Sequence, residues 1–320
     1  MTEIKLLDGS ESYQLSKHVG EKIDGDPLWT ARFLATNPDA VLAMHLDFLR
    51  AGSNIICTNT YQASVPGFVK YLNVTEEEGI NLIKSAVKLA RKAIDIYKEE
   101  TKCTDVQNKN PLIAGACGPY GAAQHDSSEY TGSYGKIIPQ STLMDFHRIR
   151  IKALIDAGVD LLALETIPCY EEAEALVELL KEFPTAKVWL SFSCREDAKN
   201  LADGSNFQES ALRCYKNAQP GQIVAIGVNC LPPKIVSTLL KGINNGDRDF
   251  IPLVVYANSG EKYFPDEGWK IVEDSPSSEY FVKEWIDLGV RYIGGCCRTD
   301  VSNLEKISIE IKKWKAENIK

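Results

Sequence analysis

The stretch Ala157-Gly158-Val159-Asp160-Leu161-Leu162-Ala163-Leu164-Glu165 decides the fold, because the end of a helix, a turn and a buried strand follow one another within it. Glycine adopts the left-handed backbone that ends a helix at little cost. The apolar run after it is typical of a parallel strand covered on both faces. The same order recurs at Ala51-Gly52-Ser53-Asn54 and at Leu288-Gly289-Val290-Arg291. This repetition indicates a chain built from successive strand–helix units.

Eight such units can be followed along the sequence. The predicted strands are short and rich in apolar residues, and they span residues 4–8, 54–60, 112–117, 160–166, 187–193, 223–230, 252–258 and 291–296. The predicted helices repeat apolar residues at intervals of three and four, and they span residues 39–49, 76–97, 141–156, 170–181, 207–216, 234–243, 278–288 and 302–316.

Eight strand–helix pairs predict the α/β class and a (β/α)8 TIM barrel, formed as a single domain over residues 1–320. The rival is a doubly wound open sheet, which more often has five or six strands and a glycine-rich first turn. No G-x-G-x-x-G motif follows the first predicted strand. The long connections 9–38, 118–140 and 259–276 all follow strands. Active sites of such barrels are built from those loops, so we expect the function there.

The composition excludes several classes of partner. A formal charge of −8 with interspersed acids and bases argues against nucleic acid or an anionic membrane as the main partner, since both reward basic patches. We see no apolar stretch long enough to span a bilayer and no signal-peptide pattern at the start. Nine cysteines, an odd number, are expected as reduced thiols of a cytoplasmic protein. We expect a monomer or a weak homo-oligomer.

Three cysteines stand at predicted strand ends. Gly227-Val228-Asn229-Cys230 closes the sixth strand, and Gly294-Gly295-Cys296-Cys297-Arg298 closes the eighth. Adjacent cysteines rarely bond each other, and three thiols converging on one rim suggest a soft metal. Zn²⁺ with three protein ligands, here Cys230, Cys296 and Cys297, keeps one position open, as catalytic sites do. We expect the two glycines to supply the bend that turns both sulfurs toward one ion.

Buried free cysteines are also common core residues. We interpret the remaining ones in this way: Cys57, Cys103, Cys117, Cys169, Cys194 and Cys214. For the three cysteines at the rim, their shared placement favours the metal over simple packing.

A site with three thiolates suits one kind of chemistry. The thiolates outweigh the charge of Zn²⁺, so the ion polarises a carbonyl poorly but keeps a bound thiol deprotonated and electron-rich. The natural co-substrate is an electrophile that already carries positive charge, such as a sulfonium methyl. Such a displacement needs no general base, and the protein has to align donor and acceptor.

Four further residues are candidates for binding the substrate. Asp8 ends the first predicted strand and Glu165 emerges from the buried fourth strand, where a charge is costly without a partner. This pair can hold the ammonium group of an amino acid. Asn258 can bind the substrate carboxylate or tie a turn. Trp29 can face a cationic sulfonium or pack within its loop.

At these residues the chain resembles the homocysteine S-methyltransferase family over nearly its full length. The segments that carry the resemblance are Asp26-Pro27-Leu28-Trp29, His45-Leu46-Asp47, Ala51-Gly52, Thr58-Asn59-Thr60-Tyr61-Gln62-Ala63, Gly118-Pro119-Tyr120-Gly121, Ser128-Glu129-Tyr130-Thr131-Gly132, Glu165-Thr166-Ile167-Pro168, Trp189-Leu190-Ser191-Phe192-Ser193, Asn258-Ser259-Gly260-Glu261 and the two cysteine segments. The split cysteine signature is the most specific part.

The resemblance implies a (β/α)8 barrel with Zn²⁺ on the three cysteines, homocysteine as methyl acceptor and methionine as product. Asp8 and Glu165 fall where the family holds the substrate's amino group. The chain looks closer to members that use S-methylmethionine or S-adenosylmethionine than to those that use betaine. One departure is that the family usually has two glycines after the first-strand aspartate, whereas Asp8-Gly9 is followed here by Ser10. If the backbone freedom of the second glycine is needed, acceptor binding changes.

Two other functions stay open at this point. A non-catalytic barrel that senses zinc or thiols requires a fourth protein ligand, for which the sequence offers no obvious candidate. A hydrolase with Cys230 as nucleophile requires a nearby histidine. None of the four histidines, His18, His45, His125 and His147, stands at a predicted strand end.

Overall fold

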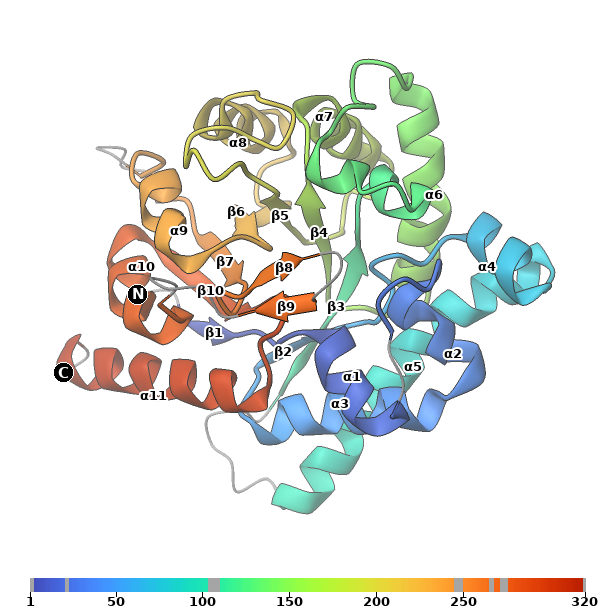
Figure 1. Cartoon of the computed structure of the whole chain (residues 1–320), viewed down its shortest axis with the longest axis horizontal. Coiled ribbons are helices and arrows are strands. Elements are labelled where there is room, and N and C mark those ends of the chain that lie inside the picture. The colour runs from blue at the N-terminus through green and yellow to red at the C-terminus, as the bar shows by residue number, and fades with distance from the viewer. Residues whose placement is uncertain are drawn as a thin grey trace.

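Eight parallel strands form a nearly closed barrel in the computed structural model, which describes residues 3–20, 23–102, 110–244, 250–264, 268–270 and 276–318 (Figure 1). The strands are β1 (Lys5–Leu6), β2 (Ile55–Cys57), β3 (Leu112–Cys117), β4 (Leu161–Ile167), β5 (Val188–Phe192), β6 (Ile223–Asn229), β7 (Leu253–Ala257) and β10 (Val290–Gly295). Their hydrogen-bonded order is β1-β10-β7-β6-β5-β4-β3-β2. Between β1 and β2, the Asn54 amide donates to the Leu6 carbonyl at 2.7 Å and the Leu6 amide to Asn54 Oδ1 at 2.8 Å. The predicted (β/α)8 barrel is confirmed.

A helix follows each barrel strand and packs on the outside of the barrel. These helices are α3 (Pro38–Arg50), α5 (Glu76–Thr101), α6 (Gln140–Asp156), α7 (Tyr170–Leu179), α8 (Phe207–Asn217), α9 (Pro233–Leu240), α10 (Val282–Leu288) and α11 (Val301–Asn318). Gly52, Gly158 and Gly289 have φ values of 100°, 88° and 114°, as predicted for glycines just past helix ends. No helix in the described part of the chain is both long and apolar enough to cross a bilayer.

The long loops contain structure that the sequence analysis did not predict. The segment 9–38 forms α1 (Glu11–Val19), the 3-10 helix η1 (Trp29–Arg32) and α2 (Phe33–Thr36), and α4 (Val65–Leu72) follows β2. Short 3-10 helices η2 (Tyr120–Gln124), η3 (Ser128–Tyr130), η4 (Leu180–Glu182) and η5 (Ser278–Phe281) complete the connections. The connection 259–276, predicted as a loop, holds an antiparallel hairpin of β8 (Lys262–Phe264) and β9 (Gly268–Lys270). In Figure 1 this hairpin is drawn across the centre of the barrel.

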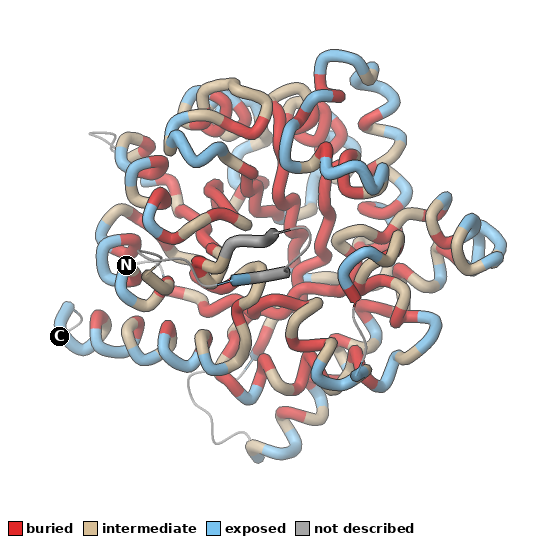
Figure 2. Tube along the Cα trace, viewed as in Figure 1, coloured by how far each residue is buried: buried red, intermediate tan, exposed pale blue. Residues whose placement is uncertain are grey.

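The inside of the barrel is filled by side chains, and Trp189 is the largest of them. Trp189 is fully buried there, and its neighbours in the same cluster include Ala114, Ala116, Ala163 and Ala225. A larger apolar core lies between the strands and the surrounding helices. Figure 2 shows the barrel strands as mostly buried. Because side chains fill the barrel itself, open space for a ligand is found at the carboxyl ends of the strands.

Candidate active site

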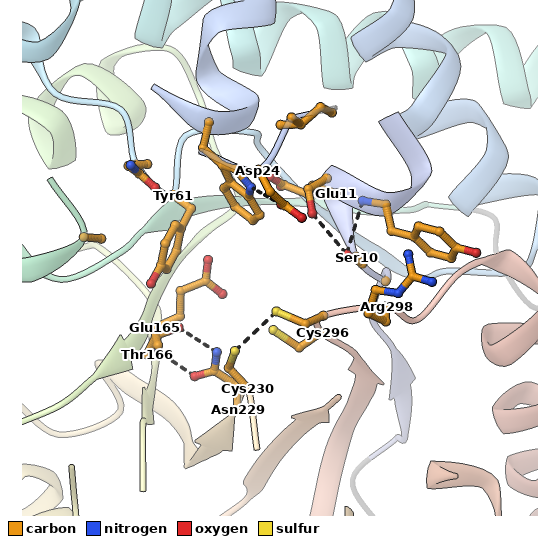
Figure 3. Close-up of a pocket in the computed structure, with 18 of the residues that line it drawn as sticks. Ser10, Glu11, Asp24, Tyr61, Glu165, Thr166, Asn229, Cys230, Cys296 and Arg298 are labelled. Atoms are coloured by element: carbon orange, nitrogen blue, oxygen red, sulfur yellow. Dashed lines mark hydrogen bonds between the residues drawn. The ribbon is translucent and has the colours of Figure 1, made fainter. Parts of the chain in front are cut away.

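A cavity of about 780 Å³ opens at the carboxyl ends of the barrel strands. The segment after β1, the loop before η1 and the ends of β4, β6 and β10 all contribute to its lining (Figure 3). Six of the seven residues proposed from the sequence line this cavity: Asp8, Trp29, Glu165, Cys230, Cys296 and Cys297. The seventh, Asn258, is not part of the lining.

The sulfur atoms of Cys230, Cys296 and Cys297 lie within 4.8 Å of one another. The sulfurs of Cys230 and Cys297 are 3.5 Å apart. Three thiolates placed about 2.3 Å from a tetrahedral Zn²⁺ stand roughly 3.8 Å apart, so the spacing fits such an ion. All three residues are partly exposed, which leaves one side of the cluster open to the cavity. Among the described residues, no fourth histidine, cysteine or carboxylate completes this group.

The ionisation of the three thiols also fits a cation site. The pKa of Cys230 lies well below its ordinary value because the Cys296 and Cys297 thiols donate hydrogen bonds to its sulfur. The pKa values of Cys296 and Cys297 are raised well above their ordinary value, chiefly by these same interactions. Negative charge on this cluster therefore favours Cys230, and a bound divalent cation would favour ionisation of the other two thiols.

The backbone that aims the sulfurs differs from our expectation. Neither Gly294 nor Gly295 is left-handed, whereas Cys230 itself bends the chain after β6 with φ 56°. A Cβ on Gly294 would lie 2.5 Å from Leu7 Cβ, and one on Gly295 would lie 2.0 Å from Thr299 Oγ1. The two glycines are required because neighbouring groups approach β10 closely, and neither supplies a left-handed bend.

The other cysteines lie mainly in the core. Cys57, Cys117, Cys169 and Cys214 are buried and Cys194 is partly buried. Cys57 lines the cavity as well. Cys103 lies outside the described residues.

Asp8 and Glu165 are buried carboxylates that face the cavity. Asp8 Oδ2 accepts a hydrogen bond from the Cys57 amide at 2.6 Å, and burial raises the pKa of Asp8 to about 6. Glu165 Oε2 accepts a hydrogen bond from the Tyr256 hydroxyl at 2.8 Å. Burial raises the pKa of Glu165 to about 8, and the nearby Asp8 contributes to the rise. The two carboxyls therefore occupy a site where their negative charge lacks compensation.

A hydrogen-bond network holds Glu165 and the end of β6 in place. Tyr256 on β7, which donates to Glu165, accepts from Trp189 Nε1 at 3.1 Å. Asn229 on β6 accepts from the Thr166 amide at 2.8 Å and donates to Thr166 Oγ1 at 2.8 Å. Since Asn229 precedes Cys230, this pair of bonds fixes the sulfur relative to Glu165. Tyr256 and Asn229 were not predicted, because polar residues inside apolar strands resemble ordinary core positions.

A third buried carboxylate, Glu11, was also missed. It begins α1, lines the cavity and is 8% exposed. The pKa of Glu11 is raised well above its ordinary value by burial and then by the charges of Asp8 and Glu165. Ser10 before it is the N-cap of α1, with φ −68° and a side chain that accepts from the Tyr13 amide. Any residue can adopt these backbone angles, so position 10 does not require a second glycine.

Aromatic side chains form another part of the lining. The Trp29 and Tyr61 rings meet edge to face with centroids 5.6 Å apart, and Trp29 Nε1 donates to Asp24 at 3.4 Å. The Tyr130 hydroxyl lies 3.7 Å from the Cys230 sulfur. Trp29 was proposed from the sequence, whereas Tyr61 and Tyr130 were not singled out.

Asn258 lies beside the cysteines instead of facing the cavity. Its backbone amide donates to the Leu231 carbonyl at 3.0 Å, and its side chain helps to lower the pKa of Cys230. Its Oδ1 is buried without a hydrogen-bond partner among the described atoms. Its role toward the substrate carboxylate stays a prediction.

Comparison with known proteins identifies the family. The model of the homocysteine S-methyltransferase family matches residues 5–311. The chain belongs to the homocysteine S-methyltransferase family. Within this family it is 49% identical to a betaine-homocysteine S-methyltransferase of Drosophila melanogaster over 308 residues, which cover 93% of this chain and 92% of that protein. It is 37% identical to the homocysteine S-methyltransferase YbgG of Bacillus subtilis, with 95% and 93% covered.

A solved structure of the same family has the same fold. The metallated form of the homocysteine methyltransferase MmuM from Escherichia coli superposes with a TM-score of 0.81 at 36% identity, and 96% of each chain is covered. By its family membership the chain is a methyltransferase. The name of one relative gives betaine as the methyl donor and the names of the others give no donor, so similarity alone does not choose one.

Proposed function

We propose that this methyltransferase moves a methyl group from a sulfonium donor, S-methylmethionine or S-adenosylmethionine, to the thiol of L-homocysteine, giving methionine. Zn²⁺ would be held by Cys230, Cys296 and Cys297. The observation that carries the proposal is the cluster of three sulfurs within 4.8 Å at the edge of an acidic cavity.

The three cysteine ligands suit zinc in both type and number. Three thiolates are typical zinc ligands, and a fourth position open to the cavity is typical of catalytic zinc. When bound, the ion lowers the pKa of a substrate thiol and preserves its sulfur as a nucleophile near neutral pH.

Asp8 and Glu165 would hold the ammonium group of homocysteine. Both carboxyls are buried, and the pKa values of both are raised. An ammonium group placed between them supplies the missing positive charge and N–H donors. It also restores the ordinary ionisation of the pair. The Tyr256 hydroxyl, which already donates to Glu165, fixes the direction in which the carboxylate points.

The charges of the cavity favour a cationic donor. Its lining includes the carboxylates Asp8, Glu11, Asp24, Glu129 and Glu165. The arginine of the lining, Arg298, is already paired with Glu261 at 2.6 Å. Trp29 and Tyr61 offer aromatic faces that favour a sulfonium methyl over a neutral methyl group.

The reaction transfers a methyl group without a redox partner. The acceptor sulfur loses its proton to solvent and forms a bond to the methyl carbon, while the bond from that carbon to the donor sulfur breaks. The electron pair stays on the donor sulfur, which becomes a neutral thioether. The contribution of Asp8, Glu165 and the aromatic side chains is to hold both substrates in line, and misalignment by about 1 Å can cost on the order of 100-fold in rate.

We also propose that the chain works in the cytoplasm. The cysteines described by the structure are all unpaired, and free thiols persist in a reducing compartment. A monomer or weak homo-oligomer stays our prediction.

A panel of donors tests the proposal. The zinc-loaded protein is incubated with homocysteine and with deuteromethyl-labelled S-methylmethionine, S-adenosylmethionine or betaine, and labelled methionine is measured by mass spectrometry. We expect labelled methionine from at least one sulfonium donor. Labelled methionine from betaine alone would overturn the donor class, and no methionine from any donor would overturn the function.

A further inference from the structure

Glu11 is a carboxylate that the acceptor site does not use. It stands at the first position of α1, with its side chain among those that line the cavity. Its Oε2 accepts a hydrogen bond from Thr30 Oγ1 at 3.2 Å. Its Oε1 is buried without a hydrogen-bond partner in the described part of the chain. An unpaired buried carboxylate oxygen is costly, so an advantage must offset that cost.

The surroundings of Glu11 separate it from the cysteines. Thr30, its hydrogen-bond partner, follows Trp29 in the chain, and the Thr30 carbonyl accepts from Asn59 Nδ2 at 3.0 Å. These contacts connect Glu11 to the loop that carries the Trp29 indole. Glu165, in contrast, is electrostatically coupled to Cys230. Glu11 thus contacts the loop on the aromatic side of the cavity, and its charge also reaches Asp8 and Glu165, whereas Glu165 is coupled to Cys230.

The number of charges indicates what Glu11 binds. The acceptor supplies one ammonium group, which Asp8 and Glu165 take. A third carboxylate with a free oxygen calls for a second cation that has N–H donors, because a quaternary nitrogen or a sulfonium has none to give. An amino-acid sulfonium carries such an ammonium group in addition to its reactive sulfur.

We propose that Glu11 binds the ammonium group of the methyl donor and so selects donors that are sulfonium derivatives of amino acids. This inference rests on the proposed function. It adds a specificity residue to that function and disfavours betaine, which lacks N–H donors.

The test compares two sulfonium donors in the wild type and in Glu11→Gln. S-methylmethionine has an ammonium group, and dimethylsulfoniopropionate has the same reactive sulfonium without one. We expect Glu11→Gln to raise the KM for S-methylmethionine about 10- to 100-fold, the range for loss of a charged hydrogen bond. The KM values for dimethylsulfoniopropionate and for homocysteine should change less than about threefold, and Glu11→Asp should recover part of the affinity for S-methylmethionine.

Two readouts that do not depend on turnover complete the test. Calorimetric titration of S-methylmethionine into the protein should show the same loss of affinity in Glu11→Gln. The thermal midpoint of the ligand-free variant at pH 8 should rise, because an uncompensated buried carboxyl is removed; a purely structural Glu11 would make it fall.

The outcomes separate the two claims. If Glu11→Gln changes the KM values of both donors equally, or leaves the binding of S-methylmethionine unchanged, the role of Glu11 is overturned. Normal turnover by the wild type would still support the proposed function in that case. Wild-type protein that neither turns over nor binds any sulfonium donor would overturn both.

Discussion

Glu165→Gln should stabilise the ligand-free protein while weakening its affinity for homocysteine. Burial raises the pKa of Glu165 from 4.5 to about 8. An acid whose pKa is higher in the folded state loses stability as the pH rises from its unfolded value to its folded value. One pKa unit corresponds to about 1.4 kcal/mol, so the penalty is about 3 kcal/mol at pH 7 and about 5 kcal/mol above pH 8.

Part of this penalty is recovered by the variant. A glutamine keeps an oxygen that can accept from the Tyr256 hydroxyl, which donates to Glu165 at 2.8 Å. The hydrogen bond to a neutral amide is weaker than that to a carboxylate by about 1 kcal/mol. We therefore expect a net gain of about 2 kcal/mol in the free energy of unfolding at pH 7, and no gain at pH 4.

Urea denaturation of the reduced protein between pH 4 and pH 8.5 measures this difference. The curves of wild type and variant should separate progressively above about pH 5. Removing the charge of Glu165 also relieves Glu11, whose pKa that charge raises, so the difference between the two proteins contains both effects, and both stabilise the variant as the pH rises. A difference that does not vary with pH would refute the assignment of Glu165 as an uncompensated buried acid.

Glu172→Gln is the matched control. Glu172 is also fully buried, but it accepts hydrogen bonds from the Tyr120 amide, the Tyr134 hydroxyl and His147 Nε2. An amide in its place turns an NH₂ group toward one of these donors, so we expect a loss of about 2 kcal/mol. In kinetics, Glu165→Gln should raise the KM for homocysteine without removing zinc, and an unchanged kcat/KM would exclude an ammonium-binding role.

Three further predictions follow from other parts of the structure. Cys297→Ser should abolish stoichiometric zinc binding and activity while the circular dichroism spectrum stays that of the wild type. Cys214→Ser is the control and should keep its metal. Full activity of Cys297→Ser with one zinc per chain would contradict the ligand assignment. The kcat/KM for homocysteine should fall as the pH drops through about 8 and again through about 6, the pKa values to which burial raises Glu165 and Asp8, because a protonated carboxyl binds ammonium poorly. Asp8→Asn should have a low kcat/KM and lack the fall near pH 6, and a fall near pH 6 that persists in Asp8→Asn would assign it to another group. Gly227→Ala should lower the free energy of unfolding by more than about 4 kcal/mol or prevent folding, because the added Cβ would lie 1.8 Å from the Val254 carbonyl oxygen on the neighbouring strand. Soluble expression of this variant with a wild-type thermal midpoint would refute this packing.

The sequence predicted those features that local patterns encode. Apolar runs such as the one before Glu165 reveal buried parallel strands, and glycines such as Gly158 mark the ends of helices. Together these patterns predicted the barrel and therefore the placement of Cys230, Cys296 and Cys297 at one rim. The charge of Glu165 inside an apolar strand was a further local signal.

Features that depend on tertiary contacts escaped sequence reasoning. Glu11 looks like any acidic residue at a helix start, and only the fold shows that its side chain is buried in the cavity. Tyr256 reads as a core residue of β7, although its hydroxyl positions Glu165. The left-handed backbone of Cys230 could not be anticipated, because non-glycine residues seldom adopt it. The hairpin of β8 and β9 was not predicted, although Pro265, Asp266 and Gly268 between and at its strands are residues typical of turns.

X-ray absorption at the zinc edge tests the central claim most directly, with protein purified under reducing conditions and measured before and after addition of homocysteine. The account predicts one zinc per chain with three sulfur ligands and one lighter atom, and four sulfur ligands once homocysteine is present. Protein without bound zinc, or a coordination shell that homocysteine leaves unchanged, would contradict it.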